Sequence, residues 1–148
     1  MDLTSSITDL RHVGIVTDNI EESIKFYHSL FGYEVRKDQI ESGIFLDKTL
    51  NLKGIKVRTV KMSRDGSCQI ELLHYLSHPR EKFFNEACSI GISHLAFTVE
   101  DLDNIYNSFS DKGIEFYAPP QPSPDGYARL TFCKAPEGTL IELVELLQ

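Results

Sequence analysis

Two histidines and two glutamates stand at matching places in the two halves of the chain. His12 opens an apolar stretch, and His94 opens a similar stretch at an offset of 82 residues. Glu71 and Glu142 each lie inside a short apolar run, at an offset of 71. A carboxylate among apolar neighbours is costly to bury unless it is paired or binds a cation. The repetition of both residue types therefore predicts a shared role for the four side chains.

That role is metal binding. Two neutral imidazoles and two carboxylates suit a borderline divalent ion such as Zn, Ni, Co, Mn or Fe(II). We therefore predict that one divalent metal ion is bound by His12, Glu71, His94 and Glu142. The two carboxylates would formally neutralise the ion. An octahedral ion with four protein ligands keeps two positions, which is enough to chelate a substrate through two adjacent oxygens.

The residues around the histidines leave room for such a site. Neighbouring side chains of a strand point to opposite faces, so His12 shares its face with Gly14, and His94 shares its face with Ala96. The bulky residues of each strand point the other way, where they can pack on a helix. The predicted site is therefore flanked by small residues in both halves.

Each half of the chain has the pattern of one βαβββ module. A helix is expected after Asp18 or Asn19, which can cap it, and should end at Gly32. The second helix is expected after Asp101 and should end at Gly113. The strands that follow the helices are expected at about 33–38, 55–62, 67–76, 115–117, 127–134 and 139–146. The prediction is an α+β protein with one single domain, 1–148, made of module one (about 8–76), a linker (about 77–90) and module two (about 91–148).

Three segments fall outside the repeat. Residues 118–125 are rich in proline and are expected to form a loop. Residues 80–86 follow Pro79 and are expected to form a short connecting helix. The first half also carries an insertion at about 42–54, where an amphipathic turn or short helix could cover a sheet edge or act as a lid over a pocket.

The other histidines and the cysteines are expected to have no chemical role. His28, His74 and His78 have no partners at the repeat positions, so we expect them on the surface. Cys68, Cys88 and Cys133 are an odd, widely spaced set without a metal-site pattern, which indicates free thiols in a reducing cytoplasm. Each of them is expected to be a buried structural residue. The basic cluster at 53–64 could be a row of solvated side chains or a patch that meets an anionic substrate.

Charge and hydropathy exclude several classes of partner. The formal net charge of −7 argues against nucleic acid and against an anionic membrane, because both attract clustered Lys and Arg. No apolar run approaches the roughly 20 residues that span a bilayer, and the N-terminus has no signal-peptide pattern. We therefore expect a soluble cytoplasmic protein.

The motifs together resemble the vicinal oxygen chelate superfamily, which includes glyoxalase I, methylmalonyl-CoA epimerase, extradiol dioxygenases, and bleomycin and fosfomycin resistance proteins. The resemblance covers about residues 10–147. It is carried by residues 12–18, 26–27, 30–32, 69–73, 91–99 and 136–145. It implies a glyoxalase/dioxygenase fold, in which two βαβββ modules form a cupped mixed sheet around a central metal site. It also implies a homodimer.

The ligand set is similar to that of bacterial glyoxalase I. The resemblance implies a metal-dependent lyase or isomerase whose substrate carries vicinal oxygens. A proton next to a carbonyl would be abstracted to give a metal-bound enediolate, with Glu142 or Glu71 as the base and Glu142 favoured. The alternatives are an isomerase like methylmalonyl-CoA epimerase, then an extradiol-type dioxygenase or a non-enzymatic small-ligand binding protein. Epimerases generally carry a further catalytic Glu on the strand that includes Val57, and often a second His at the position of Ser93. This chain departs from that pattern at both places.

Overall fold

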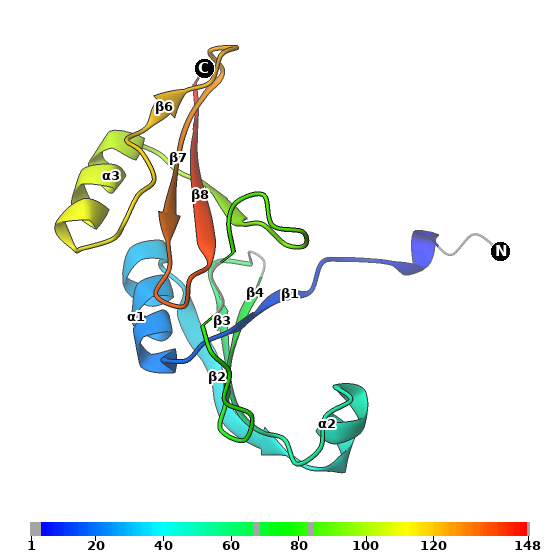
Figure 1. Cartoon of the computed structure of the whole chain (residues 1–148). Helices are drawn as coiled ribbons and strands as arrows, with labels where there is room; N and C mark the ends of the chain where they lie inside the picture. The colour runs from blue at the N-terminus through cyan, green and yellow to red at the C-terminus, as the bar shows by residue number, and fades with distance from the viewer. Residues whose placement is uncertain (1–3, 67–68, 83–84, 148) are drawn as a thin grey trace. The chain divides into compact units, whose positions relative to one another are not determined.

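The chain divides into two compact units, Met1–Arg80 and Glu81–Gln148 (Figure 1). The computed structural model describes residues 4–66, 69–82 and 85–147. Each unit contains one four-stranded sheet and one long helix. No helix in the described ranges is long and apolar enough to cross a membrane.

The first unit follows the βαβββ order, with a 3₁₀ turn before it and a short helix inserted. Its elements are η1 (Thr4–Ser6), β1 (His12–Val16), α1 (Ile20–Phe31), β2 (Glu34–Ser42), α2 (Ile44–Thr49), β3 (Lys56–Ser63) and β4 (Gln69–Tyr75). The strand order across the sheet is β1-β4-β3-β2. Strand β1 runs parallel to β4, and the other pairs are antiparallel. The parallel pair places the start of β1 beside the start of β4.

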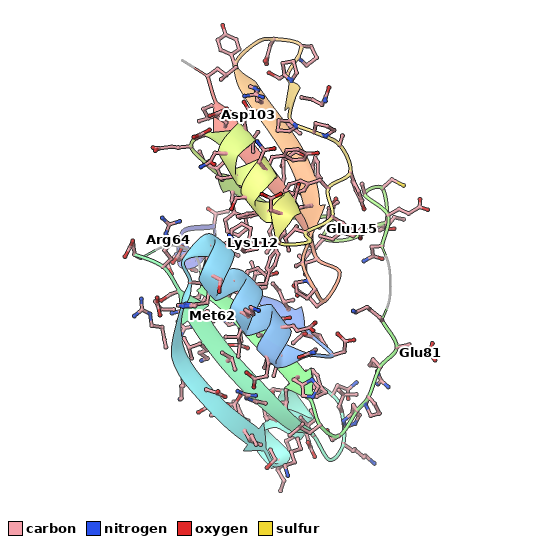
Figure 2. All side chains as sticks on the ribbon, turned by 90° about the vertical axis from the view of Figure 1, so that its left-hand side faces the viewer. Met62, Arg64, Glu81, Asp103, Lys112 and Glu115 are labelled. Atoms are coloured by element: carbon pink, nitrogen blue, oxygen red, sulfur yellow. The ribbon has the colours of Figure 1, made fainter. Side chains whose placement is uncertain are left out.

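Helix α1 has the boundaries that its sequence signals predict. The side chain of Asn19 accepts a hydrogen bond from the backbone N–H of Glu22, which caps the first turn. Gly32 ends the helix at φ 71°, a left-handed conformation that favours glycine. Phe31, at the end of α1, accepts a hydrogen bond through its carbonyl from the guanidinium of Arg64, and Figure 2 shows Arg64 beside this end of the helix.

Much of the core of the first unit lies between α1 and one face of the sheet. Phe26 and Tyr27 pack edge to face with ring centroids 5.1 Å apart, and both are buried. Ile70 and Leu72 of β4 are buried as well, because alternate residues of this strand face the helix. The intervening residue, Glu71, therefore points to the opposite face.

The second unit repeats this arrangement. Its elements are β5 (Leu95–Thr98), α3 (Leu102–Asp111), β6 (Gln121–Pro122), β7 (Ala128–Lys134) and β8 (Leu140–Leu146). The strand order is β5-β8-β7-β6, with β5 parallel to β8. Ile141 and Leu143 are buried, so Glu142 between them faces away from this core. The predicted α+β class and the two four-stranded mixed sheets are confirmed.

Two expectations for the second unit are wrong. Residues 115–117 do not form a strand but make one isolated bridge, between Phe116 and Cys133. The pairing stops there because Pro119 and Pro120 follow and have no backbone N–H to donate. Within the expected loop, Gln121–Pro122 forms the two-residue strand β6 against β7. Proline is tolerated in β6 because this strand lies at the edge of the sheet.

The helix that was predicted for the connecting segment is not found in its described residues, whereas the insertion does form a short helix. Described residues 80–82 and 85–86 are exposed and not helical, so the helix expected at 80–86 does not form there; Phe83 and Phe84, like Cys68, lie outside the described residues. A short helix that packs no apolar face is marginal in water. The insertion forms α2, as predicted, although none of its residues is buried. The carboxylate of Asp47 stabilises the insertion by accepting hydrogen bonds from the backbone N–H groups of Gly54 (2.9 Å) and Ile55 (3.0 Å).

Candidate metal centre

In the first unit, His12 and Glu71 meet on the sheet face that points away from α1. His12 Nε2 lies 3.8 Å from Glu71 Oε2, and the two side chains are 32% and 17% exposed. Gly14 pairs with Glu71 across the parallel β1–β4 register. Because Gly14 has no side chain, the space beside the carboxylate stays open. This unit thus places one imidazole and one carboxylate together, half-buried but accessible.

In the second unit, His94 and Glu142 form the equivalent pair. His94 precedes β5 by one residue, and its Nε2 lies 3.0 Å from Glu142 Oε2. The two side chains are 35% and 18% exposed. His94 Nδ1 lies 3.0 Å from Ser93 Oγ, and its ring stands edge-on to Phe132 with centroids 5.2 Å apart. Ser93 and Phe132 therefore hold the imidazole in its orientation from two sides.

Both pairs fit metal ligation. Ligands about 2.0–2.2 Å from one ion are separated by about 3 Å at a right angle and by at most about 4.4 Å. The separations of 3.8 Å and 3.0 Å fall within these limits. In residues 4–66, 69–82 and 85–147, no group of three or more His, Cys, Asp or Glu side chains is gathered. Each unit thus supplies two of the four predicted ligands, and the convergence of all four stays a prediction.

The other histidines are not all on the surface. His28 is exposed, as expected. His74 and His78 are half-buried, and His74 Nδ1 lies 2.9 Å from the carbonyl oxygen of Thr17. His74 alternates with Glu71 along β4, so it points to the α1 face and helps to hold the turn into that helix. His74 and His78 therefore keep only part of the exposure that was expected of them.

Sequence reasoning missed the residues that flank the two glutamates on the sheet. Lys61 pairs with Glu71 in the β3–β4 register, and its Nζ lies 3.9 Å from Glu71 Oε2. Phe132 pairs with Glu142 in the β7–β8 register. Lys61 and Phe132 are separated by 71 positions, the same offset as the glutamates. That offset, applied to the neighbouring strands, is the signal that could have identified both.

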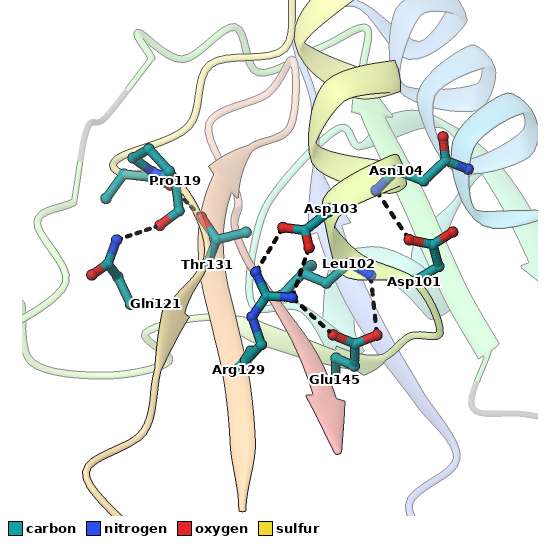
Figure 3. A network of polar contacts seen from close by, with 10 residues as sticks. Asp101, Leu102, Asp103, Asn104, Pro119, Gln121, Arg129, Thr131 and Glu145 are labelled. Atoms are coloured by element: carbon teal, nitrogen blue, oxygen red, sulfur yellow. Dashed lines mark hydrogen bonds and ion pairs between the residues drawn. The ribbon is translucent and has the colours of Figure 1, made fainter. Parts of the chain in front are cut away.

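In the second unit, a polar network with a structural role lies on the sheet face opposite to His94 and Glu142 (Figure 3). The guanidinium of Arg129 donates to both carboxylate oxygens of Asp103, at 2.8 and 2.6 Å. These hydrogen bonds, with the charge of Arg129, lower the pKa of Asp103. Glu145 accepts from Arg129 and from the backbone N–H of Leu102, which is the first residue of α3. The network fastens the start of α3 to the sheet.

The chain belongs to the Glyoxalase/Bleomycin resistance protein/Dioxygenase superfamily, whose profile matches residues 9–143. An uncharacterized Bacillus subtilis protein, YwkD, is 31% identical over 94% of this chain and 98% of its own length. A mitochondrial methylmalonyl-CoA epimerase of Dictyostelium discoideum is 29% identical over 94% of this chain and 79% of its own length. A probable lactoylglutathione lyase of Synechocystis is 28% identical over 92% of this chain and 94% of its own length.

The fold agrees with this membership. The crystal structure of a glyoxalase family protein from Bacillus cereus matches with a TM-score of 0.85 and 24% sequence identity, over 98% of this chain and 99% of that one. The expected glyoxalase fold is therefore confirmed. The superfamily includes many enzymes, and its members share the fold more widely than they share a reaction.

Proposed function

We propose that the chain is a metal-dependent lyase or isomerase of glyoxalase I type that binds one divalent ion through His12, Glu71, His94 and Glu142. The observation that carries the proposal is the repeated His–Glu pair. Each unit holds an imidazole nitrogen and a carboxylate oxygen within 3.8 Å, on the sheet face that the helix leaves free. The similarity to the Synechocystis probable lactoylglutathione lyase supports the same reaction class.

Some residues of the site would bind the metal ion, and one of the glutamates would accept a proton from the substrate. A divalent ion at this site would act as a Lewis acid that polarises a substrate carbonyl. His12 and His94 would stay as fixed ligands, and Ser93 and Phe132 hold the His94 ring in its orientation. Glu142 would accept the carbon-bound proton. It is favoured because its carboxylate lies beside one imidazole, that of His94, whereas Glu71 lies beside both His12 and the ammonium group of Lys61.

The first test is the metal content of protein purified without chelator and without added metal. We expect about one transition metal ion per chain. The double variant Glu71→Ala/Glu142→Ala should lose it, because both carboxylate ligands are removed. The matched control is Glu34→Ala/Glu115→Ala, which removes two exposed carboxylates of β2 and of the segment before β6 and should keep the metal. If neither wild type nor control holds or takes up metal, the enzyme proposal is wrong and a ligand-binding role remains.

The second test is turnover of an α-keto aldehyde hemithioacetal formed with glutathione. We expect isomerisation by the metal-loaded protein. Glu142→Gln should keep most of the metal and lose turnover by about 100-fold or more, which is typical of a removed general base. A Glu142→Gln protein with both metal and full turnover would show that the base is another residue. If the native ion is iron, catechol cleavage becomes the assay, since Fe(II) serves dioxygenase chemistry.

An epimerase reaction is the second candidate, and one carboxylate favours it. Glu41 of β2 lies opposite Val57 in the β2–β3 register, so it shares the sheet face of Glu71. Its Oε2 accepts a hydrogen bond from Thr59 Oγ1 at 2.7 Å. Epimerisation needs two acid–base groups, and Glu41 supplies a carboxylate on the strand next to Val57. The 29% identity to the Dictyostelium epimerase supports this alternative.

Solvent deuterium separates the two reactions. An epimerase should incorporate deuterium at the α-position of a 2-methylmalonyl thioester, and Glu41→Gln should abolish this exchange while the metal stays bound. Absence of exchange in the wild type would remove the epimerase candidate. We also propose that the protein is a homodimer, for which light scattering should give about 34 kDa, twice the 16.8 kDa of one chain.

A further inference from the structure

The two glutamates of the proposed centre have different neighbours. Beside Glu71 on the sheet stands Lys61, an ammonium group, whereas beside Glu142 stands the ring of Phe132. Phe132 packs against His94. Lys61 lies too far from Glu71, at 3.9 Å, for a hydrogen bond, and its side chain is 34% exposed. The first unit thus carries a positive charge beside its His–Glu pair that the second unit replaces with an apolar ring.

A second lysine stands next to Lys61. Lys37 of β2 is the residue directly opposite Lys61 in the antiparallel β2–β3 register, so both side chains project from the same face. Their Cβ atoms are therefore about 4.5–5.5 Å apart, a separation at which like charges destabilise a sheet. In the part of the chain that the structure describes, Lys37 makes no ion pair and Lys61 contacts only Glu71. Among these described residues, Glu71 is therefore the one anion that offsets the charge of this lysine pair, and of the two lysines it pairs with Lys61 alone.

The other basic residues of β3 do not belong to this pair. Lys56 and Arg58 point to the opposite face, where Arg58 binds Glu21 at the start of α1. Of the three basic residues of this strand, only Lys61 lies on the sheet face of His12 and Glu71. If Glu71 ligates a divalent ion, its charge is taken up by that ion, and the positive charge of Lys61 is left without a partner.

We propose that Lys61, together with Lys37, binds an anionic oxyacid group of the substrate, a carboxylate or a phosphate, next to the two oxygens that reach the metal. This inference rests on the proposed function and names the substrate class for the same site. The substrate is then a chelating molecule with an additional negative group. The ammonium groups donate charge-assisted hydrogen bonds to that group, which also relieves their mutual repulsion.

The test is binding of three probes to Co(II)-loaded protein, measured by calorimetry and by the visible spectrum of the ion. Lactate carries only the chelating α-hydroxy acid, malate adds a carboxylate, and 3-phosphoglycerate adds a phosphate. We expect lactate to change the spectrum and bind weakly. Malate or 3-phosphoglycerate should bind at least about tenfold more tightly, the effect of one hydrogen bond to a charged group. The probe with the larger gain identifies the anion.

The variants assign the gain to the lysines. Lys61→Met should remove most of the advantage over lactate, and an unchanged visible spectrum of the bound Co(II) before the probe is added shows that the metal site is intact. Lys61→Arg should retain the advantage, and Lys37→Met/Lys61→Met should abolish it. Lys56→Met, on the opposite face of β3, is the matched control and should behave as wild type.

Three results would overturn the inference. If all three probes bind wild type equally while the spectrum still changes, the lysines bind no anion, and the proposed function is untouched. If Lys61→Met keeps the preference for malate or 3-phosphoglycerate, the anion is bound elsewhere. If the protein takes up no Co(II) and no other divalent ion, the proposed function itself fails and this inference fails with it.

Discussion

Arg58 and Arg129 occupy the same position in the two repeats and make the same bridge. Arg58 of β3 binds the carboxylate of Glu21 in the first turn of α1, and a second carboxylate on β2. Arg129 of β7 binds that of Asp103 in the first turn of α3, and a second carboxylate on β8. The two arginines are separated by 71 positions, like Glu71 and Glu142. Each unit therefore fastens its helix to the sheet on the face opposite to its His–Glu pair.

Loss of the Arg58 bridge should destabilise the first unit. Arg58→Met removes two ion pairs of a side chain that is 27% exposed, so we expect the free energy of unfolding to fall by about 0.5–1 kcal/mol. Urea denaturation followed by circular dichroism measures the change. Arg80→Met alters an exposed arginine and is the control. A loss no larger than that of the control would show that the bridge contributes nothing measurable.

Acid should weaken the same bridge. Asp38 is the carboxylate of β2 that Arg58 binds. The hydrogen bond from Arg58, together with the positive charge of the guanidinium, lowers the pKa of Asp38, and burial opposes this only in part. A carboxyl whose pKa is lower in the folded state contributes stability that is present above its unfolded value of about 4 and is lost as the pH falls through the folded value. The difference in unfolding free energy between wild type and Asp38→Asn should therefore shrink from pH 7 to pH 3. A difference that is constant over this range would contradict the coupling.

Two of the cysteines should differ strongly in reactivity. Burial raises the pKa of the Cys133 thiol to about 12, so almost no thiolate exists near neutral pH. Cys88 is exposed, so the expected buried position was wrong for this residue. Iodoacetamide at pH 8, followed by peptide mapping, should label Cys88 in the native protein and Cys133 only after unfolding. Labelling of Cys133 at the rate of Cys88 in native protein would mean that β7 opens readily.

Gly14 should matter for access to the site and little for the fold. A Cβ added at Gly14 would lie 3.6 Å from the side chain of Leu73, an ordinary contact, so Gly14→Ala should fold and bind metal as wild type does. Gly14→Leu would place a large side chain beside Glu71, which pairs with Gly14 in the sheet. We expect lower metal content with an unchanged circular dichroism spectrum. Equal loss of metal in both variants would instead indicate a backbone effect.

The sequence by itself determined the two modules, because their signals are local. Strand alternation placed Glu71 and Glu142 on one face of their strands, and caps at Asn19 and Gly32 set the ends of α1, since both features depend only on neighbouring residues. The offsets of 82 and 71 identified the repeat and its four candidate ligands. The same local reasoning failed for described residues 80–82 and 85–86, which are exposed and not helical.

Only the tertiary structure decided which strands lie side by side, and therefore which residues become neighbours. Sequence separation hides that Lys61 faces Glu71, that Lys37 stands opposite Lys61, and that Phe132 packs on His94. These contacts depend on the register of the paired strands, and in the β2–β3 pair a bulge between Val35 and Lys37 shifts that register by one residue. A shift of one residue turns every later side chain to the other face. The charge next to the His–Glu pair is thus a property of the sheet register, which no single segment of the sequence contains.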